Sequence, residues 1–418
     1  MTSARQADAQ EESVAAGRAA KYAPADQQTP HIARRTVLIF AVSCGLVVAN
    51  LYYAQPMLNV IGREFKSDAG AVGLVVTLTQ VGYAVGLLFV VPLGDLLNRR
   101  RLVCTVLLAT TAALIAAALA PSLAVLAAVS LIIGLTSVVA QVLVPYAASL
   151  SWPEERGRVV GAVMSGLLIG ILLARTFSGL VGQVSSWRVV YWLGAGLMLV
   201  LILVLRRELP RADPHPEAPA YGPLLRSVGK IVREEPLLRR RSVYGALVFA
   251  AFSVFWTTAA FLLSRPPYSF GQAVIGLFGL AGVAGALCAS VAGRLADRGF
   301  SRPSTGAFLL AALLSFSLLA LGGCFLIPLI FGVIVLDLGV QGTHITNQSE
   351  IYRLRPEARS RLTTAYMVTY FIGGSLGSAT SAVVYARFGW GGVCLLGAAY
   401  LAVAVAYWLT ELLPTVRA

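Results

Sequence analysis

The sequence predicts an all-α membrane protein with twelve transmembrane helices, arranged as two six-helix parallel repeats. Three observations support this prediction. The 418 residues are 57% hydrophobic and 12% charged, with a mean hydropathy of +0.77, whereas soluble proteins carry about 25% charged residues. The chain contains a succession of apolar stretches, each near the ~20 residues that a helix needs to span a bilayer. Motifs of the first half also recur in the second half at a nearly constant spacing.

The chain opens with a polar segment, residues 1–33, which lacks the apolar region of a signal peptide and is expected to be a disordered cytoplasmic tail. Residues 34–206 are expected to form the first six-helix bundle, and residues 242–418 the second. The spans are predicted at residues 36–58, 71–94, 102–120, 123–146, 159–182, 188–206, 242–263, 272–296, 304–323, 326–348, 362–385 and 391–411.

Residues 207–241 form a proline-containing linker between the two bundles. Apolar residues recur at helical spacing between positions 224 and 232, and basic residues lie between them. This pattern predicts a short amphipathic helix on the inner membrane surface, which tethers the two halves.

The basic residues are distributed unevenly between the two sides of the membrane. Of 33 Lys and Arg residues, 27 fall in the tail, the linker and the loops on the side of both termini, and five fall in loops on the other side. Cytoplasmic loops carry such an excess, so both termini are predicted to be cytoplasmic. The net charge of +14 therefore indicates contact with the lipid bilayer and not with nucleic acid.

The cysteines and histidines predict no cofactor. All five cysteines lie in apolar runs, none forms a Cys-x-x-Cys pair, and the three histidines are far apart in the sequence. These spacings do not fit a disulfide framework or a metal site. The spans also lack a cluster of His with Asp or Cys, so the chain is not expected to be an enzyme.

The two halves repeat each other. Residues 153–158, Pro-Glu-Glu-Arg-Gly-Arg, resemble residues 356–361, Pro-Glu-Ala-Arg-Ser-Arg, and the same offset relates Trp187 to Trp390. Six spans return the chain to its starting side, so the repeats are parallel. Many secondary transporters are built in this way, with a substrate site between the halves near the midplane of the membrane.

A loop motif identifies a family resemblance. Residues 91–100 read Val-Pro-Leu-Gly-Asp-Leu-Leu-Asn-Arg-Arg and residues 293–299 read Gly-Arg-Leu-Ala-Asp-Arg-Gly, each between the second and third span of its half. Both resemble the Gly-x-Leu-Ala-Asp-Arg-x-Gly-Arg-Arg pattern of the major facilitator superfamily, and the second copy matches it more closely. The resemblance covers residues 34–412 and implies a transporter that works by alternating access.

The resemblance assigns conformational gating to the loop motif. It implies that Asp95, with Arg99 and Arg100, holds the cytoplasmic side closed against the start of the eleventh helix, and that Asp297 and Arg298 form the second copy of this gate. A carboxylate at a helix N-terminus is favoured by the helix dipole. The alternative is that Asp95 pairs only with Arg99 or Arg100 at the membrane edge.

Within the superfamily the chain looks most like the bacterial drug:proton antiporters and their sugar-efflux relatives. This resemblance implies a monomer in a bacterial-type inner (plasma) membrane, which exports a small organic solute in exchange for protons. Two features depart from the branch: residues 134–145 lack its helix-4 arginine, and Ile171 replaces the proline of its Gly-x-x-x-Gly-Pro motif. Gly166 and Gly170 retain the glycine part, which also suits close helix packing.

Two charged residues are predicted inside the membrane, where each costs about 2.5–3.5 kcal/mol at mid-helix. Asp337 lies in the tenth span and begins a polar face that continues with Gln341 and His344, and Arg175 lies in the fifth span. We predict that Asp337 carries the proton, that His344 relays it or bonds the substrate, and that Arg175 is the counter-ion of Asp337 or a clamp for a substrate anion. The alternatives are a permanent Asp337–Arg175 pair that locks the halves, and a His344 that is hydrogen-bonded at a packed helix face.

The resemblance implies that the first, fourth, seventh and tenth helices line the central cavity. Polar and aromatic residues on these spans are therefore the candidates for substrate contact: Asn50, Tyr53, Gln55, Gln141, Trp256 and Gln341. The alternative for each is a hydrogen bond between helices, worth about 0.6 kcal/mol on average.

The energy source is predicted to be an ion gradient, because the chain lacks the Gly-x-x-x-x-Gly-Lys-Ser/Thr loop that binds ATP phosphates. Two other functions remain open from the sequence. One is a proton symporter that imports a sugar or an organic acid. The other is a membrane sensor that uses the same fold without transporting anything. The sequence does not identify the substrate or its charge.

Overall fold

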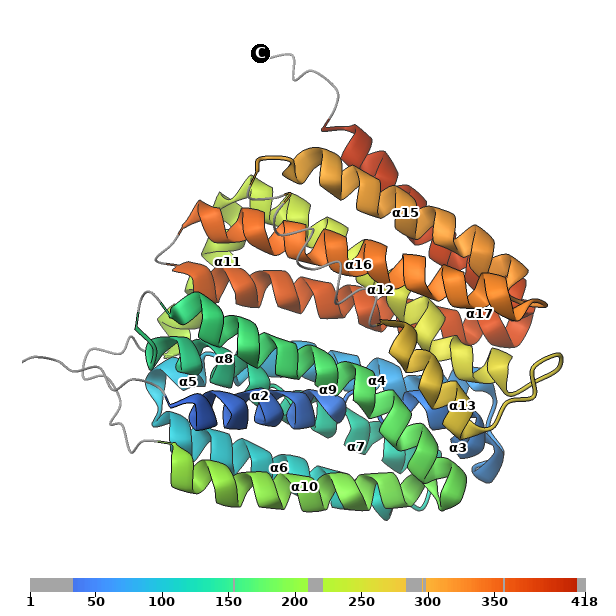
Figure 1. Cartoon of the computed structure of the whole chain (residues 1–418), viewed down its shortest axis with the longest axis horizontal. Coiled ribbons are helices and arrows are strands. Elements are labelled where there is room, and N and C mark those ends of the chain that lie inside the picture. The colour runs from blue at the N-terminus through green and yellow to red at the C-terminus, as the bar shows by residue number, and fades with distance from the viewer. Residues whose placement is uncertain are drawn as a thin grey trace, which may run out of the picture.

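The computed structural model describes residues 33–152, 155–209, 221–282, 295, 298–355 and 358–411. These residues form helices and no strands, which confirms the predicted all-α fold class (Figure 1). Nine of the described helices are long and apolar enough to cross a membrane. The predicted disordered tail, except for Ala33, and residues 210–220 of the linker lie outside the described residues.

Eight of these nine helices each correspond to one predicted span. They are α4 (Ala69–Phe89), α6 (Arg99–Ala118), α7 (Leu123–Thr136) continued by α8 (Val139–Ser149), α9 (Arg156–Val184), α10 (Trp187–Glu208), α12 (Pro236–Leu263), α15 (Ser301–Leu321) and α16 (Leu326–Leu354). Several begin at a capping side chain that accepts a hydrogen bond from a free backbone N–H, such as Asp68 before α4 and Asn98 before α6.

The ninth helix, α17 (Arg359–Leu409), contains both the eleventh and the twelfth predicted span. The two parts meet at Gly389, where φ is 63°. This left-handed backbone is accessible to glycine at little cost and interrupts the helix.

Two predicted spans are not the continuous helices that the hydropathy pattern indicated. The first span is divided into α2 (Arg34–Ala49), the short helix η1 (Gln55–Met57) and α3 (Leu58–Glu64). Pro56 has no N–H group with which to continue the α-helix. The described part of the eighth span consists of α13 (Gln272–Leu277) and the 3₁₀ segment η2 (Phe278–Gly282).

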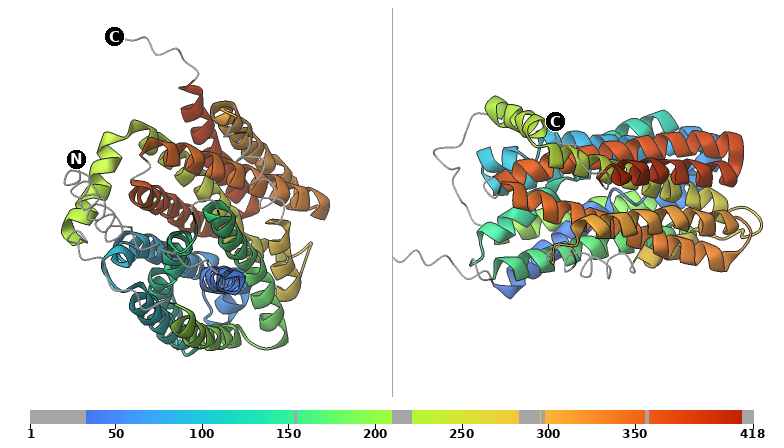
Figure 2. Two further views of the ribbon diagram at one scale, coloured as in Figure 1. Left: turned by 60° about the vertical axis from the view of Figure 1, so that its left-hand side comes forward. Right: turned by 90° about the horizontal axis from the view of Figure 1, so that it is seen from above.

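The helices form two bundles that lie side by side. Helices α2 to α10 pack together as the N-terminal half, and α12 to α17 pack together as the C-terminal half (Figure 1). The linker helix α11 (Tyr221–Glu234) lies across one end of the bundles (Figure 2), which we call the linker end. The opposite end, with α3 and the loop at residues 264–271, is the distal end (Figure 1).

Helix α11 is amphipathic, as the sequence predicted. It buries Val228 and Ile231, while the basic residues Arg226, Lys230 and Arg233 remain at least partly exposed. At its start, the Tyr221 hydroxyl donates to the carbonyl oxygen of Phe89 in the N-terminal half. Just past its end, Arg355 of the C-terminal half pairs with Glu234 and Glu235. The linker helix therefore contacts both halves.

Close helix packing accounts for the glycines of the fifth span. Gly166 and Gly170 of α9 face Ala41 and Gly45 of α2, and a Cβ atom added at Gly45 would lie 2.7 Å from the Gly166 carbonyl oxygen. The Gly-x-x-x-Gly part of the motif thus brings two backbones together within the N-terminal half.

The seventh span begins earlier than predicted, and the helix therefore includes the charged residue Arg241. Helix α12 begins at Pro236, so Arg241 belongs to the helix and not to the linker. The Arg241 side chain is buried at 3% exposure and donates to the Thr305 hydroxyl at 2.8 Å. Proline is favoured at the first turn of a helix, and this allows α12 to start several residues earlier than the apolar run.

Candidate functional site

Arg175 is held by residues of the first span. Its side chain is 2% exposed, and its Nε donates to the Gln55 side-chain oxygen at 2.7 Å. The guanidinium also lies over the Tyr52 ring, with 4.7 Å between the Arg175 Cζ and the ring centroid. Tyr52 lies in the break between α2 and η1, and Gln55 is the first residue of η1. The interruption of the first span thereby places both side chains against Arg175.

Trp256 of α12 connects Arg175 to Asp337. The Arg175 Cζ lies 4.0 Å from the centroid of the indole ring, within the range of a cation–π interaction. The indole Nε1 donates a long hydrogen bond of 3.4 Å to Oδ1 of Asp337. The two charges are not a direct ion pair, because no nitrogen of Arg175 lies within 4.0 Å of an Asp337 oxygen.

In this structure the two charges are not in direct contact, and the prediction that Asp337 pairs with Arg175 during part of a transport cycle stays a prediction. The guanidinium lies over the face of the Trp256 indole and the carboxylate lies at its N–H. One Arg175 nitrogen, Nη2, is buried without a hydrogen-bond partner. Asp337 is 6% exposed, and a Cβ added at Gly282 of η2 would lie 2.6 Å from its Oδ2. The absence of a side chain at Gly282 therefore leaves room for the carboxylate.

The site is shared between the two halves. Tyr52, Gln55 and Arg175 belong to the N-terminal half, whereas Trp256 and Asp337 belong to the C-terminal half. The cation–π contact between Arg175 and Trp256 therefore crosses the interface. Any relative movement of the halves at this level has to change it.

The two halves are in close contact at the distal side of this site. The Thr77 hydroxyl of α4 donates to the Ser378 hydroxyl of α17 at 3.0 Å. The Thr176 hydroxyl of α9 donates to the carbonyl oxygen of Gly276 in α13 at 3.3 Å. A cavity between Arg175, Trp256 and the distal ends of α12 and α13 measures about 10 Å³. This volume is close to that of a single water probe, so no organic molecule passes through it.

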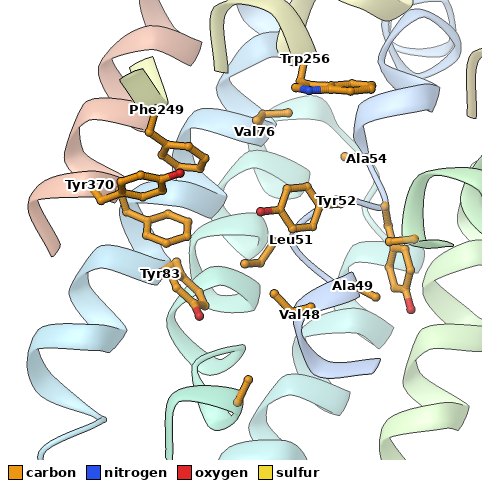
Figure 3. Close-up of a cluster of buried hydrophobic side chains, with 14 of the residues drawn as sticks. Val48, Ala49, Leu51, Tyr52, Ala54, Val76, Tyr83, Phe249, Trp256 and Tyr370 are labelled. Atoms are coloured by element: carbon orange, nitrogen blue, oxygen red, sulfur yellow. The ribbon is translucent and has the colours of Figure 1, made fainter. Parts of the chain in front are cut away.

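Polar residues continue from Asp337 toward the linker end along α16. Gln341, His344 and Gln348 follow on the same face, and each of them is more exposed than Asp337. Buried aromatic side chains of both halves gather in one cluster: Figure 3 shows Tyr52 and Trp256 across from Phe249, Tyr370 and Tyr83. The polar face is thus partly exposed on the linker side of Asp337.

His344 is hydrogen-bonded within the C-terminal half. Its Nδ1 lies 3.0 Å from the Tyr366 hydroxyl, and its ring is tilted against Tyr370 with 4.8 Å between the centroids. This geometry agrees with the alternative of a hydrogen-bonded histidine at a packed face. It also keeps the imidazole on the polar face that begins at Asp337.

The other predicted cavity residues make contacts within the N-terminal half. The amide of Asn50 lies 3.6 Å from the sulfur of Met198, Tyr53 packs against Phe177, and the amide of Gln141 donates to the Tyr83 hydroxyl at 3.3 Å. Gln141 is partly exposed, whereas Asn50 and Tyr53 are buried. Asn50 and Tyr53 therefore contribute to helix packing in this structure, and Gln141 is the accessible candidate.

Only part of the predicted gate lies in the described residues. The side chain of Asp95 and all of Asp297 lie outside them. Arg99 donates from Nε to the Gly94 carbonyl oxygen and from Nη1 to the Ser149 hydroxyl, which ties the loop to the end of α8. Arg100 is partly exposed and Arg298 is exposed.

Sequence reasoning missed two residues of this region and one, Arg241, that lies nearer the linker end of α12. Tyr52 and Phe252 both place their rings near the Arg175 guanidinium, at 4.7 and 5.9 Å. The spacing of Tyr52 and Gln55, three residues apart, was a signal that both face the same way. The buried Arg241 also lies near polar residues, because its carbonyl oxygen accepts a hydrogen bond from Asn347.

The distal contact predicts a disulfide. In a cysteine-free background with a protease site inserted in the linker, Thr77→Cys with Ser378→Cys is expected to cross-link the halves in most molecules. The two native hydroxyl oxygens lie only 3.0 Å apart, within the reach of a disulfide. The measurement is a non-reducing gel after proteolysis, on which cross-linked halves migrate together.

A matched pair at the other end provides the control. Ser149→Cys in α8 and Thr363→Cys in α17 lie at the linker end of opposite halves and are expected not to cross-link under the same conditions. If the control pair cross-links as fully as the distal pair, the described asymmetry between the two ends is wrong.

The comparisons with known proteins agree with the fold. The sequence model of the Major Facilitator Superfamily matches residues 38–378. The "Putative uncharacterized transporter YgaY" of Escherichia coli strain K12 is 48% identical over 374 residues, which cover 89% of this chain and 94% of that protein. The "Probable transporter SCO4007" of Streptomyces coelicolor is 37% identical over 371 residues, covering 88% of this chain and 86% of that protein.

A similar fold occurs among solved structures. The crystal structure of the nucleoside transporter NupG superimposes with a TM-score of 0.71 at 16% sequence identity, covering 90% of this chain and 98% of that chain. In the part of the chain that the structure describes, no three His, Cys, Asp or Glu residues are grouped as metal ligands would be.

Proposed function

Because this chain belongs to the Major Facilitator Superfamily of membrane transporters, we propose that it exports a small organic solute in exchange for protons. It works by alternating access as a monomer in a bacterial-type inner membrane, with both termini in the cytoplasm. Asp337 carries the proton, and Arg175 is the cation with which its charged form interacts.

The observation that carries this proposal is the position of the two buried charges on opposite halves. A charge in the membrane interior is costly and is retained mainly where it has a function. Asp337 and Arg175 contact the same indole ring, at an interface that has to open when the transporter changes state. A carboxylate that gains and loses a proton there changes the energy of that interface directly.

The described conformation supports a cytoplasmic opening. The contacts Thr77–Ser378 and Thr176–Gly276 close the distal end, and the distribution of basic residues favours a linker end that faces the cytoplasm. The face from Gln341 to Gln348 then provides an accessible polar route from the cytoplasm toward Asp337.

The energetics suit export. One proton that crosses a potential of 100 mV provides about 2.3 kcal/mol, enough for a roughly 50-fold gradient of a neutral solute.

The test uses energised inverted membrane vesicles with an acidified lumen and a pH-sensitive dye. Lipophilic drugs, sugars and organic acids are added outside, one at a time, to vesicles with the wild-type protein or with Asp337→Asn. We expect at least one compound to raise the luminal pH in wild type and not in Asp337→Asn, because export into the lumen consumes the proton gradient.

The other outcomes distinguish the alternatives. An equal response in both proteins would leave an antiporter in which Asp337 is not the proton carrier. A response only when the compound is loaded inside the lumen would indicate a symporter that imports its substrate. No response in any arrangement, from vesicles that contain folded protein, would contradict transport of these three compound classes.

A further inference from the structure

We propose that Trp256 is a positioning residue that couples the charge on Asp337 to closure of the distal end. The inference rests on the proposed function and extends it to a residue whose predicted role was substrate contact. The indole makes two different contacts at once. Its ring face contacts the Arg175 guanidinium, and its N–H donates a hydrogen bond to the Asp337 carboxylate.

The indole joins a contact across the interface to a contact within the C-terminal half: its ring meets Arg175 of the N-terminal half, and its N–H meets Asp337 of its own half. Arg175 is fixed in the N-terminal half by Gln55, and Asp337 is part of the C-terminal half. Since the two charges make no direct ion pair, the indole is the side chain through which the described contact passes. Trp256 is buried at 4% exposure, so water does not compete for its ring.

Protonation of Asp337 weakens both contacts together. A hydrogen bond to a carboxylate is roughly twice as strong as one to a neutral acceptor. An N–H that donates to an anion also places more negative charge on the ring face, which strengthens the attraction for a cation. The charged form of Asp337 therefore orients the indole and favours the Arg175 contact, and the neutral form does so less.

The consequence for transport follows from linkage. If the charged form of Asp337 favours the closed distal end, then distal closure equally favours release of the proton, because such coupling is reciprocal. The proton is then taken up while the distal end is open and is released while it is closed. In the predicted topology this cycle carries protons from the outside to the cytoplasm, the direction that export requires.

Other titratable groups near Asp337 are few. The described side chains in electrostatic contact with it are Arg175, Tyr52 and Tyr370. Arg175 stays protonated at all physiological pH values, and tyrosine hydroxyls remain neutral there. Asp337 is therefore the member of this group that changes its charge between pH 5 and pH 8 in the proposed cycle.

The test follows the distal distance without any substrate, with protons as the only ligand. Spin labels are placed at Arg63→Cys and Ser269→Cys, two exposed positions on opposite halves at the distal end, in a cysteine-free background. Double electron–electron resonance is then recorded in nanodiscs between pH 5 and pH 8. Without further changes, we expect acidification to raise the ratio of open to closed distal ends about tenfold, within the range typical of coupled sites.

Two variants separate the indole N–H from the ring. Trp256→Phe keeps an aromatic ring but has no donor, and replacement of Trp256 by benzothienylalanine keeps the shape of the indole and removes only the N–H. Both are expected to reduce the pH-dependent change to less than about twofold, while the distal distance at pH 8 stays in the native range. Trp192→Phe is the matched control, because Trp192 is exposed on α10, and it is expected to respond as the native protein does.

The outcomes are distinguishable. A native pH response in both Trp256 variants would overturn the role of Trp256 and leave proton coupling intact. A native protein that shows no pH response at all would contradict proton coupling itself, and with it this inference. Should Trp256→Phe not fold, the benzothienylalanine variant decides the question, because it changes a single N–H group.

Discussion

Arg175→Ala is expected to abolish proton-driven uphill transport in a protein that still folds. Arg175 and Asp337 both contact the Trp256 indole, and Arg175 also holds the Gln55 side chain. A desolvated cation–π contact is worth about 2 kcal/mol, which corresponds to more than a tenfold change in an equilibrium. Without the cation, the charged carboxylate loses its counter-ion, so Asp337 stays protonated and cannot deliver its proton.

The measurement is compound-dependent alkalinisation in the inverted vesicles, with an expected loss of at least about tenfold for Arg175→Ala. Arg175→Lys is expected to retain part of the activity, because an ammonium keeps the charge but lacks the planar group that stacks on an indole. Arg63→Ala, which removes an exposed arginine at the distal end, should behave as wild type. Full proton-driven flux in Arg175→Ala would contradict the assigned role.

Gly134→Ala is expected to destabilise the N-terminal half strongly, although it adds only one methyl group. A Cβ at Gly134 would overlap the carbonyl oxygen of Thr79, and a Cβ at Gly82 would likewise overlap that of Leu131. Both obstacles are backbone atoms, so no side chain can rotate away. Overpacking of this kind costs about 1–3 kcal/mol or more, which exceeds the roughly 0.5–1 kcal/mol that Ala gains over Gly in a helix.

The control is Gly196→Ala on α10, where nothing lies within 4 Å of the added Cβ. This substitution is expected to be neutral or slightly stabilising, because only the helix propensity changes. The melting temperatures of the two purified variants, measured by size-exclusion chromatography after heating, provide the comparison. A Gly134→Ala protein that melts at or above the temperature of Gly196→Ala would show that α4 and α7 separate at little cost.

The shift of α4 in Gly134→Ala has a functional consequence as well. Helix α4 also carries Thr77 and Gln80, which contact Ser378 and Ser253 of the C-terminal half. A displaced α4 therefore weakens the distal closure, and the disulfide between positions 77 and 378 should form in fewer molecules.

The sequence by itself determined the fold class and the positions of most spans. A span is visible as a run of about 20 apolar residues, and the basic residues between such runs indicate their orientation. The sequence also identified Asp337 and Arg175, since a charge within an apolar run is visible without any structure. The sequence was wrong in predicting two of the spans as continuous α-helices. The first is interrupted and contains Pro56, and the eighth contains the 3₁₀ helix η2 in place of α-helical turns.

Only the tertiary structure decided how the two charges are related. Arg175 and Asp337 are 162 residues apart, and neither the hydropathy nor the helical period of either span reports what lies between them. The structure shows that the Trp256 indole contacts both charges, and that Tyr52 and Gln55 also contact the guanidinium. Local sequence patterns determine which face of its helix a residue occupies. Contacts between the halves depend in addition on how the two bundles pack against each other, and a local pattern does not report that.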